Sequence, residues 1–197
     1  MAAIDQRTAK RVYFAFHYQD VIDFRANVVR NHNALQGVER AGYYDHSIWE
    51  ESRKTSDLAL KRLINAELER TSVTAVLIGS HTYVRRWVRY EIAKSVERGN
   101  KLVGIHINGV TGRDGLTKMS GPNPFAHMGL AVSEDGLTGQ LSQWDGTQWV
   151  WYEDLDKFAL NRQPLEMRGK SHYLTHWFKT YDWIADAGYQ NFSSWIS

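Results

Sequence analysis

Three short apolar runs constrain the fold of this chain more than any other feature. They span residues 12–16, 73–78 and 102–107, and none alternates apolar with polar residues. Continuous apolar runs of this length are typical of parallel strands that are covered on both faces. A fourth run, residues 43–49, is more polar, and we expect it nearer an edge of the same sheet.

Helical patterns separate these runs. Apolar residues recur at helical spacing over residues 54–70 and 84–98, and more weakly over residues 20–30. Gly99 is a suitable residue to end the second of these helices. Strands that alternate with helices indicate βαβ units with right-handed crossovers. We therefore predict an α/β protein with a flavodoxin-like fold, in which helices flank a central parallel sheet.

The second half of the chain has a different character. Residues 108–123 predict a long glycine-containing loop, and the aromatic residues around Asp145-Gly146 predict a hairpin. Beyond them we expect an amphipathic helix that ends near Gly188. The apolar residues on one side of that helix would be Leu174, Trp177, Phe178, Tyr181 and Ile184.

We divide the chain into an N-terminal extension, residues 1–9, and one domain, residues 10–197. The α/β core would span about 10–108, and about 109–197 would form a C-terminal elaboration with a hairpin and a helix. Most of the eight tryptophans are expected to pack in the core and the hairpin, Trp49 and Trp87 excepted.

Composition excludes several classes of protein. Hydrophobic residues make up 43% and charged residues 23%, as in a folded domain. A net charge of +2 does not suggest a protein that coats nucleic acid. The absence of cysteine removes disulfides, thiolate catalysis and Cys-ligated zinc. No apolar run approaches the ~20 residues of a membrane span, and the N-terminus lacks an apolar signal core. We expect a cytoplasmic protein that binds neither nucleic acid nor membranes.

Glu91 is the residue that stands out chemically. At 100° per residue it falls within the apolar stripe of its helix, beside Trp87 and Val88. A carboxylate on such a stripe costs several kcal/mol unless it is paired or faces a cleft where it acts. Two interpretations follow from the residues alone. Glu91 is either a structural residue bonded to Ser95 or nearby backbone, or a catalytic carboxylate.

The place of Glu91 relative to the strands bears on this choice. Open α/β sheets bind ligands outside the carboxyl ends of their strands, at the point where strand order switches. The first strand, the second strand and the third strand with its following helix all supply polar or aromatic residues near that point. The candidate lining residues are Phe16, His17, Tyr18, Trp49, Ser80, Tyr83 and Trp87.

Other motifs are missing. The glycines after residue 107 do not have the dinucleotide-binding spacing, and there is no phosphate-binding P-loop. His172 and His176 are four residues apart but point away from the apolar side of the expected helix. We therefore expect a solvated pair and no metal site.

Residues 14–18, 76–80 and 86–92 resemble the corresponding stretches of a TIR domain. Trp87 and Glu91 match the W-x-x-x-E spacing of the family's NAD-consuming members. The resemblance covers nearly the whole chain beyond the first eight or so residues. It is strongest to the TIR-like proteins of the bacterial Thoeris anti-phage system.

The resemblance implies that NAD⁺ is a substrate and that no cofactor is needed. Glu91 would be the catalytic glutamate, and Trp87 would stack near it. Phage infection would trigger conversion of NAD⁺ into nicotinamide and a cyclic ADP-ribose isomer, which activates a ThsA-type effector that depletes NAD. His17, Tyr18 and Trp49 would suit stacking on adenine or nicotinamide. Residues 48–52 lack the proline of the family's usual loop, so homo-oligomerisation stays open.

Two other functions fit the same residues. One is a non-catalytic TIR module that assembles with partners and in which Glu91 is structural. The other is an enzyme similar to nucleoside deoxyribosyltransferases, which attack an N-glycosidic bond with a carboxylate on a flavodoxin-like core.

Overall fold

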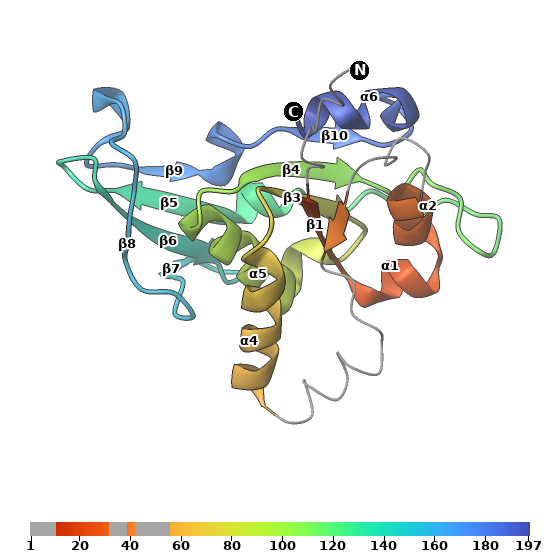
Figure 1. Cartoon of the computed structure of the whole chain (residues 1–197), viewed down its shortest axis with the longest axis horizontal. Helices are drawn as coiled ribbons and strands as arrows, with labels where there is room; N and C mark the ends of the chain where they lie inside the picture. Colours follow the sequence, from red (N-terminus) through yellow and green to blue (C-terminus); the bar gives the residue numbers. More distant parts are fainter. Residues whose placement is uncertain (1–10, 32–38, 42–55) are drawn as a thin grey trace, which may run out of the picture.

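The computed structural model describes residues 11–31, 39–41 and 56–197. A parallel sheet of five strands lies at its centre, in the order β2-β1-β3-β4-β10 (Figure 1). Its strands are β1 (Arg11–Phe16), β2 (Glu39–Ala41), β3 (Val73–Ile78), β4 (Lys101–His106) and β10 (Thr180–Asp182). The predicted α/β class with a central parallel sheet is confirmed.

The three apolar runs are the three inner strands β1, β3 and β4. All six residues of β3 are buried, as are four of six in β1 and in β4. The unbroken apolar pattern follows from this, because both faces of the sheet are covered. The fourth run, residues 43–49, lies outside the described residues.

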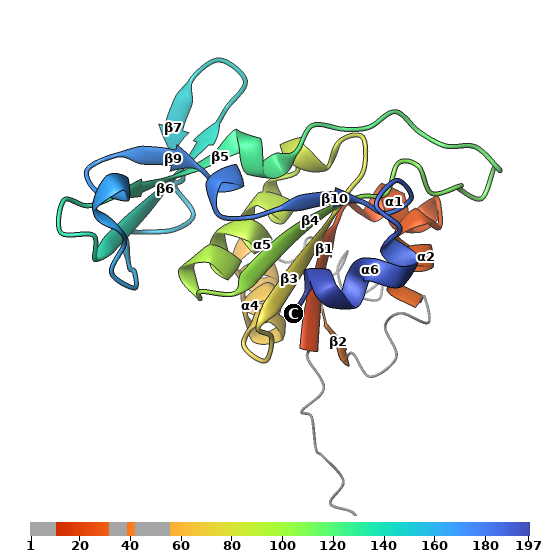
Figure 2. The same ribbon diagram turned by 90° about the horizontal axis from the view of Figure 1, so that it is seen from above.

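Helices cover the two faces of this sheet (Figure 2). On one face lie α4 (Asp57–Leu68) and α5 (Arg86–Glu97), and on the other lie α2 (Arg25–Asn31) and α6 (Gly188–Trp195). A short helix, α1 (Tyr18–Ile22), joins β1 to α2. The single helix expected over residues 20–30 is thus two helices, because the backbone at Phe24 is left-handed, with φ 66°.

Local signals set the ends of α4 and α5. The Ser56 side chain accepts a hydrogen bond from the Ala59 amide at 3.1 Å and so caps the start of α4. A 3-10 turn, η2 (Thr82–Val84), and an extended Arg85 precede α5, which therefore begins at Arg86 rather than at residue 84. Gly99, with φ +72°, follows the end of α5 as predicted.

A second, antiparallel sheet follows β4 in the chain and lies beside the α5 side of the parallel sheet. Its order is β7-β6-β5-β9, and β8 pairs with β6. Its strands are β5 (Met128–Val132), β6 (Thr138–Trp144), β7 (Trp149–Trp151), β8 (Phe158–Ala159) and β9 (Ser171–Tyr173). Short 3-10 helices connect these elements: η3 (Pro124–His127), η4 (Leu165–Met167) and η5 (Leu174–His176).

Two predictions for this half are confirmed. Residues 108–123 form a loop without helix or strand, and β6 and β7 form the hairpin around Asp145. The Asp145 carboxylate accepts hydrogen bonds from the amides of Thr147 and Gln148, at 2.7 and 2.9 Å, which closes the turn.

The helix expected over residues 174–188 is wrong. That segment forms η5, the strand β10 and a turn, and the last helix is α6. The reason is tertiary, since residues 180–182 pair in parallel with residues 104–106 and so complete the edge of the sheet beside β4. Leu174 is fully buried, whereas Ile184 is 47% exposed, so the expected helical stripe does not exist.

Candidate active site

The Glu91 carboxyl lies between α5 and the central strand β1. The residue is 7% exposed, and its Oε1 accepts a hydrogen bond from the Tyr13 hydroxyl at 2.7 Å. The Ser95 hydroxyl bonds instead to the backbone oxygen of Glu91, at 2.7 Å. The bond to Ser95 that the structural interpretation expected is thus made by the backbone oxygen of Glu91, while Tyr13 binds the carboxylate.

Burial dominates the electrostatics of this carboxyl. It raises the pKa of Glu91 to about 8, and the hydrogen bond from Tyr13 opposes that rise. Within the described part of the chain, Glu91 Oε2 is buried and has no hydrogen-bond partner. An unsatisfied buried carboxyl oxygen is costly, and such groups are concentrated at functional sites.

A second buried carboxyl, that of Asp20, lies at the carboxyl edge of the parallel sheet. Asp20 is 5% exposed, and a Cβ atom on Gly79 would lie 2.4 Å from each of its oxygens. Burial raises the pKa of Asp20 to about 6, against the opposing charges of Lys118 and Arg25. Glycine at position 79 is therefore what gives this carboxyl its space.

The residues predicted at the ends of the first and third strands reach this edge. Phe16, His17 and Tyr18 are half-buried, and burial followed by the charge of Arg85 lowers the pKa of His17 to about 4. The Ser80 hydroxyl donates to the Met119 carbonyl at 2.8 Å. β1 and β3 are neighbours with Phe16 opposite Leu77, so these residues share one edge.

Two further predicted residues differ in where they point. Trp87 lies one turn before Glu91 on α5, half-buried, with its ring 5.9 Å from that of Tyr90. Tyr83 contacts His127 of η3, at 4.9 Å between ring centroids. Trp49 lies outside the described residues.

The loop over residues 108–123 closes against the carboxyl end of β3. A Cβ atom on Gly121 would lie 2.2 Å from the Gly79 carbonyl oxygen. The buried Arg25 side chain donates to the Leu116 carbonyl at 2.6 Å and so ties the loop to α2. The loop is therefore fixed against the sheet edge from two sides.

Sequence reasoning did not single out Tyr13 or Asp20 as site residues. Tyr13 places a hydroxyl group inside an otherwise apolar strand, and its hydrogen-bond partner, Glu91, is 78 residues away in the sequence. Asp20 lies just beyond the strand, but its burial depends on Gly79. Each of these relationships arises only when β1, β3 and α5 come together.

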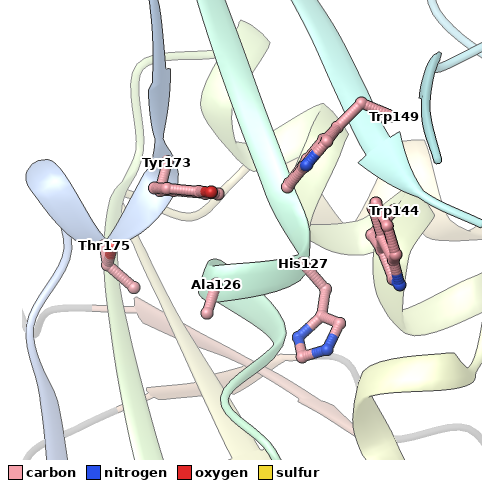
Figure 3. A pocket seen from close by; sticks show the side chains of 6 residues that line it. All are labelled: Ala126, His127, Trp144, Trp149, Tyr173 and Thr175. Carbon is pink, nitrogen blue, oxygen red and sulfur yellow. The ribbon is translucent and has the colours of Figure 1, made fainter. Parts of the chain in front are cut away.

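A separate hollow of about 440 Å³ lies against the second sheet (Figure 3). Trp144, Trp149, Tyr173 and His127 project around it, and Trp149 and Tyr173 are in contact, with ring centroids 5.4 Å apart. Trp149 packs in the hairpin as predicted, with its ring 6.0 Å from that of Trp144, although Trp149 and Trp151 are 39% and 53% exposed. β7 is an edge strand, and residues two apart in a strand share a face. Both side chains therefore lie on the same exposed face of the hairpin.

Metal-ligating residues do not gather in the part of the chain that the structure describes, where no group of three or more His, Cys, Asp or Glu could hold an ion. His172 and His176 lie on β9 and η5, not on one helix, with their rings 5.4 Å apart. His172 Nε2 lies 3.2 Å from the Met167 carbonyl oxygen. No helix within residues 11–31 or 56–197 has the length and apolar character needed to cross a membrane.

Comparison with known proteins gives two matches. The family model described as "Thoeris protein ThsB, TIR-like domain" matches residues 13–112. A Bacillus cereus (strain MSX-D12) protein named "Putative cyclic ADP-D-ribose synthase ThsB1" is 54% identical over 191 residues, which cover 96% of this chain and 100% of the relative. The second match therefore includes the antiparallel sheet as well as the parallel sheet.

Proposed function

The chain belongs to the ThsB family of TIR-like proteins, and from this premise we propose that it cleaves NAD⁺ to nicotinamide and a cyclic ADP-ribose isomer. The observation that carries the proposal is the buried Glu91 carboxyl. Tyr13 holds one of its oxygens, and the other has no hydrogen-bond partner among the residues that the structure describes. The relative that matches over its whole length is named "Putative cyclic ADP-D-ribose synthase ThsB1", which supports the same reaction here.

The chemistry requires little more than one carboxylate. When the bond between nicotinamide and ribose breaks, its electron pair leaves with nicotinamide, which becomes neutral. The ribosyl carbon becomes an oxocarbenium-like cation, which a nearby carboxylate stabilises, as in glycosidases. A nucleophilic atom of the adenosine part of the same molecule then attacks this carbon and closes the ring.

Glu91 must be ionised for this role, although burial favours its neutral form. The pyridinium ring of NAD⁺ carries a positive charge, and an opposite charge nearby lowers the pKa of a carboxyl group. Binding of NAD⁺ would therefore release the proton of Glu91 and supply the charge where the cation develops. Proton release is thus coupled to substrate binding.

The sheet edge would bind the rest of the substrate. We assign Trp87 to stacking beside Glu91, and Phe16, His17, Tyr18, Trp49, Ser80 and Tyr83 to the substrate-binding surface. The loop over residues 108–123 would limit water, which favours cyclisation over hydrolysis. NAD⁺ is the substrate, so no resident cofactor is needed.

The biological setting follows from family membership. Phage infection would activate the protein in the cytoplasm, and the cyclic product would act as a signal to a ThsA-type effector that depletes NAD. Homo-oligomerisation belongs to the same proposal.

Mass spectrometry of small molecules tests the proposal. The purified protein, and infected cells that express it, would be given NAD⁺ or deoxynucleosides in parallel. We expect nicotinamide and a cyclic ADP-ribose isomer from NAD⁺. Free base from deoxynucleosides would support the deoxyribosyltransferase reaction instead. No product from either substrate, in infected cells as well, would support a non-catalytic module.

A further inference from the structure

We propose that Tyr13 is a positioning residue of this reaction, whose hydroxyl fixes the orientation of the Glu91 carboxyl and stabilises its ionised form. The inference rests on the proposed function of Glu91. It assigns a role to a residue that the sequence motifs do not include.

The geometry of the contact is that of a preorganised pair. Tyr13 Oη and Glu91 Oε1 are 2.7 Å apart, a normal length for an O–H···O bond, and both residues are buried. Tyr13 is in the middle of a central strand, and Glu91 is in the middle of α5. Neither backbone can move without disturbing the core, so the hydrogen bond holds the carboxyl in one place.

The Tyr13–Glu91 hydrogen bond contributes little to the stability of the fold. Burial of a carboxyl group costs more solvation free energy than one hydrogen bond restores, and apolar residues of similar volume would stabilise the core more. Tyr90 provides the contrast within the same core cluster. The Tyr90 hydroxyl donates to the uncharged amide oxygen of Asn65 at 3.2 Å. A tyrosine hydroxyl in this core is thus hydrogen-bonded without the burial of a charged group.

Among the described residues, Tyr13 is the titratable group that acts on Glu91. Burial raises the pKa of Glu91, and the hydrogen bond from Tyr13 lowers it. The arginines of α5 do not face it; Arg86 pairs with Asp57 and Asp154, and Arg89 donates to Gln143 and Tyr83. Removal of the Tyr13 hydroxyl therefore leaves burial unopposed.

The test compares Tyr13→Phe with the matched control Tyr90→Phe. The pKa of Glu91 would be measured by carbon-13 NMR of glutamate labelled at the carboxyl carbon, and nicotinamide release from NAD⁺ would be followed against pH. For Tyr13→Phe we expect a pKa about one unit higher, which corresponds to a roughly tenfold loss of the ionised form. The acidic limb of the rate profile should move by the same amount. We also expect kcat/KM for NAD⁺ to fall about 10- to 100-fold, because both NAD⁺ binding and turnover need the ionised form of Glu91.

Tyr90→Phe should move none of these quantities. If Tyr13→Phe does not fold, 3-fluorotyrosine at position 13 replaces it. Fluorotyrosine is a stronger hydrogen-bond donor of nearly the same shape, and it should lower the pKa of Glu91. An unchanged pKa and pH profile, or equal shifts in the Tyr90 control, would overturn the positioning role while wild-type protein still forms product. Wild-type protein that forms no product in infected cells would overturn the proposed function itself, and the role of Tyr13 with it.

Discussion

The rings of Tyr181 and Trp195 stack face to face, with centroids 4.4 Å apart and 2° between their planes. Tyr181 is on the strand β10, and Trp195 is on the helix α6. Trp183, which follows β10, is fully buried beside Phe192 of α6, with ring centroids 6.0 Å apart. The C-terminal residues are therefore part of the main core and not an accessory.

The first prediction concerns this C-terminal core. A chain that ends before Ser171 loses β9, β10 and α6. We therefore expect insoluble protein or a melting curve without cooperativity. A milder change, Trp183→Ala, should destabilise the fold by about 3–5 kcal/mol, as measured by denaturant unfolding. Ile184→Ala, at an exposed neighbouring position, is the control and should have little effect. A soluble, cooperatively melting truncation would contradict the assignment.

The second prediction concerns Gly79. An added methyl group would lie 2.4 Å from the Asp20 carboxylate oxygens, so Gly79→Ala must displace Asp20 or the strand end. We expect a loss of stability of about 1–3 kcal/mol. Because the clash needs both side chains, Gly79→Ala should cost less in an Asp20→Ala background. Additive effects in this double-mutant cycle, measured by urea unfolding, would show that the two positions are not coupled.

The third prediction is a pH dependence of stability. The folded-state pKa of Glu91 is raised from 4.5 to about 8, and that of Asp20 from 3.8 to about 6. Between the unfolded and folded values the native state binds more protons than the unfolded state, so stability from these groups falls as pH rises. It is fully present below about pH 4 and is lost by about pH 8. Urea unfolding from pH 5 to 9 should show wild type losing more stability with pH than Glu91→Gln; parallel curves would contradict the buried carboxyl.

Particular residues show how far sequence alone can reach. The inner strands were predictable because burial on both faces removes polar residues from them, and Glu91 was identifiable because a charge on an apolar stripe is anomalous. β10 was not predictable, since residues 180–182 become a strand only through pairing with residues 104–106. Tyr13 and Asp20 were missed for the same reason, because their partners, Glu91 and Gly79, are distant in sequence.

The last prediction tests Glu91 as the catalytic carboxylate. Glu91→Gln keeps the shape of the side chain and an oxygen that accepts from the Tyr13 hydroxyl, but it removes the negative charge. Loss of a preorganised charge of this kind costs roughly 3–4 kcal/mol, or about 10²–10³ in rate.

The control is Glu97→Gln on the same helix, where the half-buried carboxylate pairs with Lys94 and should not matter for turnover. The product would be measured by mass spectrometry, and the melting temperature on the same preparations. We expect Glu91→Gln to melt at the wild-type temperature or above it, because it removes a buried group that must ionise. A structural Glu91 gives the opposite pattern, with a lower melting temperature and product lost only in proportion to folded protein. Product at the wild-type level from a folded Gln variant would remove Glu91 from the mechanism.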